Sequence, residues 1–152
     1  MTGLKLICVG KLKERFYRDA CEEYQKRLGA FCKFELCELA EEAMRPDGLA
    51  REAERVLAAV PQGSFCIAMC IEGALMSSTD LADCLTEAKN RGVSRVCVII
   101  GSSEGLHDSV KRRADLRLSM SPMTFPHHLA RVMVLEQLYR ACSIEAGTKY
   151  HK

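Results

Sequence analysis

The sequence VCVII at residues 96–100 passes directly into GSSEG at 101–105, and LSMSPMTFPH follows at 118–127. The first stretch is an apolar run typical of a buried strand, which ends in small residues and two glycines. The last combines a short strand with an irregular loop of prolines and hydroxyl residues, and an apolar helix follows it. Two loops that leave the same end of adjacent parallel strands form a ligand crevice in an open α/β sheet, so we expect a binding site here.

Apolar runs alternate with segments of helical period along the rest of the chain, which indicates an α/β fold with a parallel sheet and helices on both faces. The expected strands are residues 4–9, 31–39, 64–71, 95–100 and 116–119, and the second of them lies near an edge. The expected helices are residues 14–28, 46–60, 81–90, 107–114 and 127–143, and a tail follows over residues 145–152. The chain has 152 residues and no linker, repeat or low-complexity tract, so we expect a single domain over residues 1–152.

Composition limits the partners and the location of the protein. A net charge of +2 does not by itself indicate nucleic-acid binding, although basic ends around an acidic middle are compatible with a polyanionic partner. The nine cysteines form no Cys-x-x-Cys motif, and several lie among apolar neighbours, where cysteines behave as small buried hydrophobes. We therefore expect reduced thiols and no metal. No secretory leader and no membrane-spanning run is recognisable, so we expect a cytoplasmic protein without a membrane partner.

The last expected helix is apolar on nearly all sides between Leu129 and Cys142. A helix of this kind must be buried over most of its surface. It is either a central core helix or a helix that packs in part against a second subunit, and the pattern alone leaves both alternatives open.

Each of the two loops also has a plain structural interpretation. GSSEG lacks the Gly-Lys-Ser/Thr of a phosphate loop and the spacing of a dinucleotide fingerprint, and it is compatible with a tight turn between strand and helix. A loop with Met120, Met123 and Phe125 can wrap an adenine or can fold onto the core. His127 and Arg131 share a helix face beside this loop, where such side chains can orient a nucleic-acid base and its phosphates.

Several of these motifs closely resemble the ribosomal RNA large subunit methyltransferase H family, which belongs to the SPOUT methyltransferases. The resemblance rests on IGSSEGL at residues 100–106, RADLRLSMSPMTFPHHLARVMVLEQLYRA at 113–141 and YHK at 150–152, and it extends to AMCIEG at 68–73 and to the first residues of the chain. It implies an α/β sheet whose carboxyl-terminal part is threaded into a trefoil knot, and it implies a homodimer.

The resemblance also implies an activity, which is methyl transfer from S-adenosyl-L-methionine to N3 of a pseudouridine in 23S rRNA of the assembled ribosome. The cofactor-binding residues it implies are Met69, Gly101, Met120, Ser121, Pro122, Met123, Thr124 and Phe125. It places Arg140, Tyr150 and His151 near the target base, and His127 follows the cofactor loop. We expect His127 or His151 to accept the imide proton and Arg140 to stabilise the resulting anion, without a metal.

The chain departs from the family at two of these positions and leaves two other functions open. Met69 stands where relatives commonly have leucine, and Ser102 stands where they usually have a second glycine. A serine would be strained there if the position needed a positive φ angle. The alternatives are a SPOUT methyltransferase that acts on another RNA, such as tRNA, and a ribosome-binding module without catalysis.

Overall fold

A computed structural model describes residues 3–42 and 45–151, so Lys152 of the expected tail and the first two residues lie outside the described part. Five parallel strands form one sheet in the order β2-β1-β4-β3-β5. The strands are β1 (Gly3–Val9), β2 (Lys33–Leu39), β3 (Phe65–Leu75), β4 (Arg95–Ile100) and β5 (Leu116–Ser119). The helices are α1 (Arg15–Leu28), α2 (Gly48–Ala59), α3 (Ser78–Asn90), α4 (Asp108–Arg113) and α5 (His127–Ala146). The predicted α/β class and the predicted alternation of strands and helices are confirmed.

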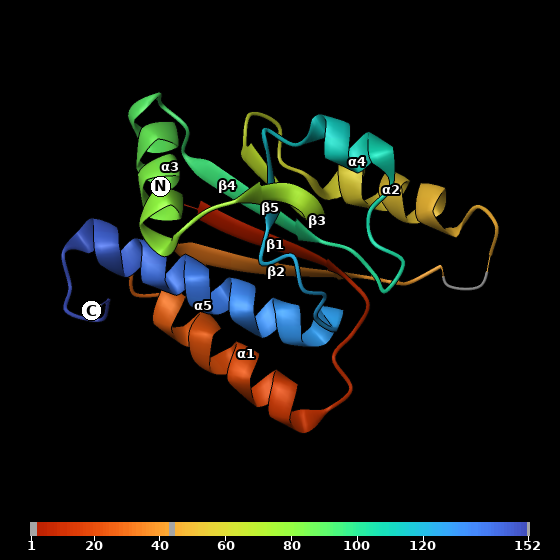
Figure 1. The fold of residues 1–152 in the computed structure, drawn as a ribbon, viewed down its shortest axis with the longest axis horizontal. Coiled ribbons are helices and arrows are strands. Elements are labelled where there is room, and N and C mark those ends of the chain that lie inside the picture. The colour runs from red at the N-terminus through yellow and green to blue at the C-terminus, as the bar shows by residue number, and fades with distance from the viewer. Residues whose placement is uncertain (1–2, 43–44, 152) are drawn as a thin grey trace.

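Helices cover both faces of the sheet (Figure 1). On one face, Leu4 and Leu6 of β1 belong to a buried cluster with side chains of α1, α3 and α5. On the other face, Ile7 and Val9 pack in a second cluster with side chains of α2 and α4. Adjacent residues of one strand are therefore buried on opposite sides, which explains why these strands read as continuous apolar runs.

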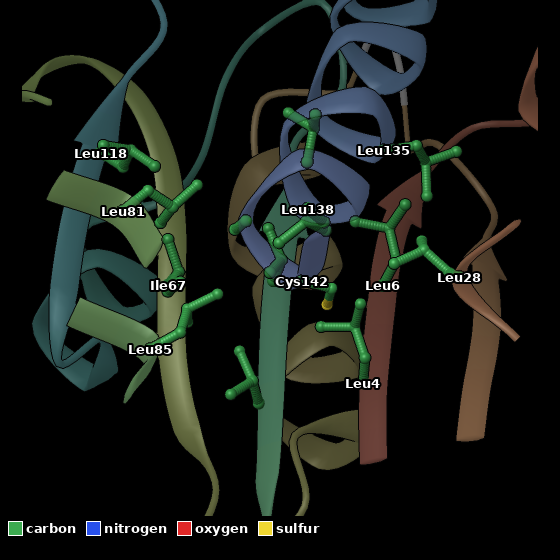
Figure 2. Packing of buried hydrophobic residues seen from close by; sticks show 14 of the residues in the cluster. Leu4, Leu6, Leu28, Ile67, Leu81, Leu85, Leu118, Leu135, Leu138 and Cys142 are labelled. Carbon is green, nitrogen blue, oxygen red and sulfur yellow. The ribbon is translucent and has the colours of Figure 1, made fainter. Parts of the chain in front are cut away.

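Helix α5 crosses the sheet between α1 and α3 (Figure 1). Its side chains Leu135, Leu138 and Cys142 enter the core over β1 and β4, as Figure 2 shows. The interpretation as a core helix is thus right for this face of α5. Two further apolar side chains of the helix, Leu129 and Met133, are only half-buried and belong to neither buried cluster.

Local signals in the sequence agree with the structure at several points. Strand β2 lies at an edge of the sheet, as expected. Helix α3 begins with a capping box in which the Ser77 hydroxyl accepts from the backbone N–H of Asp80 and the Asp80 carboxylate accepts from that of Ser77. Reciprocal bonds of this kind satisfy two backbone donors at the start of a helix. No helix within the described ranges is long and apolar enough to cross a membrane.

Two expectations about the sheet are wrong. Strands β4 and β5 are not adjacent, because β3 lies between them and pairs with both. Strand β3 also does not end at Glu72 and Gly73: its pairing with β5 shifts register between Met69 and Ala74 and then continues. A side chain at Gly73 would place its Cβ 2.7 Å from backbone atoms of Leu118. Glycine is needed here because two backbones lie in direct contact, and it does not mark the end of the strand.

Candidate active site

A cavity of about 710 Å³ lies where the chain leaves the carboxyl ends of β3, β4 and β5. Its walls come from the second half of β3, from the loop after β4 and from the loop after β5. The volume falls in the range of small-molecule and cofactor sites. The expected crevice therefore exists, but β3 separates the two strands that carry its loops and supplies a third wall.

The loop after β4 is a tight turn built on two glycines. A Cβ at Gly101 would lie 2.3 Å from the carbonyl oxygen of Gly105, and Gly105 has a φ of 84°. The backbone N–H of Gly105 donates to the carbonyl of Ser102 at 2.9 Å. Neither glycine can be replaced without moving this loop, which holds its backbone at the cavity wall.

Ser102, the unusual residue of this loop, is buried and has a specific partner. Its hydroxyl donates to the carboxylate of Glu52 on α2 at 3.1 Å. The other Glu52 oxygen accepts from the backbone N–H of Glu42 at 2.9 Å. The left-handed residue of the turn is Gly105, and the serine joins the loop to α2 through a hydrogen bond that a glycine could not make.

The loop after β5 is shaped by its own hydroxyl groups. The Ser119 hydroxyl donates to the carbonyl of Ser121 and accepts from the N–H of the same residue, at 3.0 and 3.3 Å. The Ser121 hydroxyl accepts from the N–H of Met123 at 3.0 Å. Such local bonds favour a turn over regular structure. Every predicted cofactor residue lines the cavity except Pro122; those that do are Met69, Gly101, Met120, Ser121, Met123, Thr124 and Phe125.

An ion pair at the cavity wall was not predicted. Glu72 of β3 and Lys111 of α4 line the cavity and form an ion pair at 2.5 Å. The hydrogen bond between them lowers the pKa of Glu72 and raises the pKa of Lys111. Lys111 lies on a short helix, and Glu72 resembled the end of a strand, so no spacing along the sequence connects them. Their proximity follows from the extension of β3 toward α4.

His127 lines the cavity at the start of α5, as expected from the sequence. Its Nε2 atom is buried, lies 3.5 Å from Glu41 Oε1 and has no hydrogen-bond partner in the described part of the chain. Burial and then repulsion from His128 lower its pKa, against an opposing effect of Glu41. The imidazole is therefore neutral near pH 7, which is the form that can accept a proton.

Arg131 is a structural residue and does not face a ligand. It is 2% exposed, and its guanidinium donates to Glu38 at 2.6 Å and to the carbonyl of Gly10 at 3.0 Å. These bonds join α5 to β2 and to the end of β1. The expectation that Arg131 acts with His127 on a nucleic-acid base is wrong, because the side chain enters the core.

The remaining predicted residues form a separate cluster at the other end of α5. Glu136 accepts from the guanidinium of Arg140 at 3.0 and 3.2 Å and from the hydroxyl of Tyr150 at 2.8 Å. The same guanidinium lies over the Tyr150 ring and 3.1 Å from Nδ1 of His151. Since arginine only donates, Nδ1 accepts here and the proton of the neutral ring is on Nε2.

This carboxyl-terminal cluster does not reach the cavity of its own chain. Arg140 and His127 are about 20 Å apart along the helix, at 1.5 Å per residue. None of the cluster residues lines the cavity. The hydrogen bond to Glu136 raises the pKa of Tyr150 to about 12, so the phenol stays protonated and acts as a donor. The structure thus brings the predicted cofactor residues other than Pro122 together with His127 at the cavity and holds Arg140, Tyr150 and His151 apart from them.

The described residues contain no group of three or more His, Cys, Asp or Glu side chains placed to hold a metal ion. The polar groups at the cavity are backbone amides, hydroxyls, the ion pair, the Glu104 carboxylate, the Cys70 thiol and one histidine. This set of groups suits a polar organic molecule bound through its edge and its charged ends.

Comparisons with known proteins identify the family of the chain. Residues 2–151 match the family described as Predicted SPOUT methyltransferase. A ribosomal RNA large subunit methyltransferase H from Bifidobacterium adolescentis is 45% identical over 98% of this chain and 99% of its own length. The protein of the same name from Streptococcus equi subsp. zooepidemicus is 43% identical, with the same coverage of both chains.

Solved structures of low sequence identity share the fold. A tRNA (m1G37) methyltransferase from Aquifex aeolicus superposes with a TM-score of 0.57 at 14% identity, over 91% of this chain and 70% of that one. A methyltransferase from Legionella pneumophila, solved with bound SAM, gives a TM-score of 0.52 at 13% identity, over 92% and 66% of the two chains. The fold and the full-length sequence similarity agree, and the chain belongs to the SPOUT methyltransferases and, within them, to the ribosomal RNA large subunit methyltransferase H family.

Proposed function

We propose that this protein transfers a methyl group from S-adenosyl-L-methionine to N3 of a pseudouridine in 23S rRNA of the assembled ribosome. The observation that carries the proposal is the cavity, because three separate segments bring the residues assigned to the cofactor to one place. Full-length relatives named as methyltransferases of large-subunit rRNA support the choice of substrate. We propose further that residues 1–152 form one cytoplasmic domain, since the ribosome is the substrate.

The cavity fits the cofactor in size and in chemistry. The backbone of Gly101 and of the loop from Met120 to Phe125 would hold the adenosine part, with Met69 as an apolar contact. The ion pair of Glu72 and Lys111 places one charge of each sign on the wall, which suits a ligand that carries charged groups of both signs. S-adenosylmethionine supplies a methyl group on a positively charged sulfur, so orientation of the acceptor accounts for much of the catalysis required of the protein.

His127 is our choice for the proton acceptor. The N3 imide must lose its proton as its electron pair forms the new bond to carbon and the sulfur–methyl bond breaks. His127 lines the cofactor cavity and has a lowered pKa and a buried Nε2 without a hydrogen bond in the described chain. His151 is less suited, because its Nδ1 accepts from Arg140 and its other nitrogen then carries the proton.

We propose that the protein is a homodimer in which the cluster of Arg140, Tyr150 and His151 serves the cavity of the partner subunit. About 20 Å of helix separates this cluster from the cavity of the same chain. The half-buried Leu129 and Met133 on α5 offer apolar surface for such a contact. In the dimer, Arg140 would stabilise the deprotonated imide, and its bonds to Glu136 hold the guanidinium in place.

We also propose that the carboxyl-terminal part is threaded as a trefoil knot, as in the family. The direct backbone contact of Gly73 with Leu118 supports this arrangement, as does the pairing of β3 with β5 on both sides of the register shift.

The test uses ribosomes from a strain that lacks the gene. Purified protein and labelled S-adenosylmethionine are incubated with 70S ribosomes, free 50S subunits, protein-free rRNA or tRNA, and the nucleosides are identified by mass spectrometry. We expect N3-methylpseudouridine in 23S rRNA from 70S ribosomes. Product in tRNA alone would favour the other RNA substrate. Calorimetric titration that detects no cofactor binding would favour a module without catalysis.

A further inference from the structure

The segment from Lys11 to Arg18 carries exposed positive charges, most of which form no ion pair with the described residues. Lys11, Lys13 and Arg18 are exposed and form no ion pair within residues 3–42 and 45–151. Arg15 is also exposed, and it reaches only Asp19, at 3.7 Å. A bond of this kind between exposed side chains contributes little to stability, so these cations stay available to a partner.

The residues of the same segment do little to stabilise the start of helix α1. Arg15 and Arg18 occupy the first turn of α1, where the positive end of the helix dipole disfavours cations, and that turn has no acidic residue. The N-cap residue Glu14 makes no capping bond, whereas α3 begins with a complete capping box. Phe16 is 66% exposed. Residues that stabilise neither the helix nor the core are expected at functional surfaces.

Two contacts place this segment beside the candidate active site. Glu14 lies 3.7 Å from Nδ1 of His128, and the Tyr17 ring meets the His128 ring edge-on, with centroids 6.0 Å apart. The neighbouring His127 lines the cavity, and its ring lies 4.1 Å from that of His128. In Figure 1 the connection from β1 to α1 passes the first turn of α5.

We propose that residues 11–18 form an RNA-docking surface at the rim of the cavity. Lys11, Lys13 and Arg18 would contact phosphates, and an unpaired base would stack on the exposed ring of Phe16, which rests on Tyr17 at 4.4 Å between centroids. Phosphate contacts position a nucleic acid, and aromatic faces bind the unstacked bases of RNA loops without regard to sequence. The inference rests on the proposed rRNA substrate and specifies how this substrate is held.

Two measurements test the surface. Co-sedimentation with 70S ribosomes reports docking without catalysis, and steady-state methylation gives KM and kcat for the same ribosomes. The double variant Lys11→Gln/Lys13→Gln is expected to weaken co-sedimentation and raise KM about tenfold, and to lower the slope of log affinity against log salt by about two. Phe16→Ala is expected to raise KM about fivefold or more, and Phe16→Tyr to restore it, since stacking needs only a flat ring.

Matched controls separate docking from folding and from cofactor binding. Lys33→Gln removes an exposed lysine at the amino end of β2, opposite the cavity, and is expected to leave KM unchanged. Calorimetry is expected to give each variant the wild-type Kd for S-adenosylmethionine. Wild-type co-sedimentation by the double variant and by Phe16→Ala would overturn the inference. If co-sedimentation depends on these residues while the wild type forms no methylated product, the proposed function fails and the docking surface stands.

Discussion

Two arginines of helix α5 are each held by a glutamate, and the two side chains differ in their surroundings. Arg131 is 2% exposed, and its guanidinium is fixed between Glu38 and the carbonyl of Gly10, so its charge is neutralised inside the fold. The side chain of Arg140 is 25% exposed and lies at the surface with an aromatic ring and an imidazole around it. Position relative to the sheet, and not residue type, decides which arginine side chain is accessible at the surface.

The largest expected effect concerns Arg131. Arg131→Met leaves the partly buried Glu38 carboxylate and a backbone carbonyl without their donor, so we expect a loss of about 3 kcal/mol or more in the free energy of unfolding. Urea titration followed by circular dichroism measures it. Arg140→Met is the matched control and is expected to cost less than about 1 kcal/mol. Equal losses for the two variants would remove the distinction between the two ends.

For activity we expect the larger effect from substitution of Arg140. Arg140→Ala removes the proposed anion-stabilising cation, so we expect kcat on 70S ribosomes to fall about 100-fold or more with folding unchanged. Tests of mixed dimers sharpen this prediction. Equal co-expression of Arg140→Ala with His127→Ala is expected to restore about a quarter of wild-type activity, because half of the dimers are mixed and each of these keeps one intact composite site. No recovery would place both residues in one chain's site.

A third prediction concerns the acid–base role at the cavity end of α5. His127→Asn is expected to lower kcat about 100-fold and to abolish the acid limb of its pH profile. Burial and the charge of His128 lower the pKa of His127, so in the wild type kcat should begin to fall only below about pH 6.5, the ordinary histidine value. An acid limb that survives in His127→Asn would assign the proton to another group.

The smallest expected effect is at Ser102. Ser102→Ala removes the hydrogen bond to Glu52 and leaves a buried carboxylate oxygen with one partner fewer. We expect the binding free energy of S-adenosylmethionine to weaken by about 1 kcal/mol, which calorimetry would show as a roughly fivefold higher Kd. Ser102→Thr keeps the hydroxyl and serves as the control. Wild-type affinity in Ser102→Ala would show that the loop holds its shape without Glu52.

Much of the molecule was predictable from the sequence because the signals are local. Periodicity located the strands and the helices of the described residues. The two loops that line the cavity also followed, since chain order places each of them after a strand. The resemblance supplied their chemistry, which spacing alone did not.

The parts that were missed depend on contacts between distant residues. No periodicity shows that β3 lies between β4 and β5, because strand order is decided by pairing and not by pattern. Gly73 resembled a strand end, although its role is close approach to Leu118. The pairs of Glu72 with Lys111 and Ser102 with Glu52 join residues about 40 or 50 positions apart and became visible only in three dimensions.

Arg131 also bears on how the chain reaches its native state. The residue joins the last helix to residues 93 and 121 positions earlier, so strands β1 and β2 leave the synthesis machinery long before the cation that neutralises Glu38. Such long-range contacts slow folding and delay the gain in stability until α5 has been synthesised. A nascent chain that stops before α5 therefore exposes the apolar face of its first strands, which makes truncated products targets for chaperones and proteases.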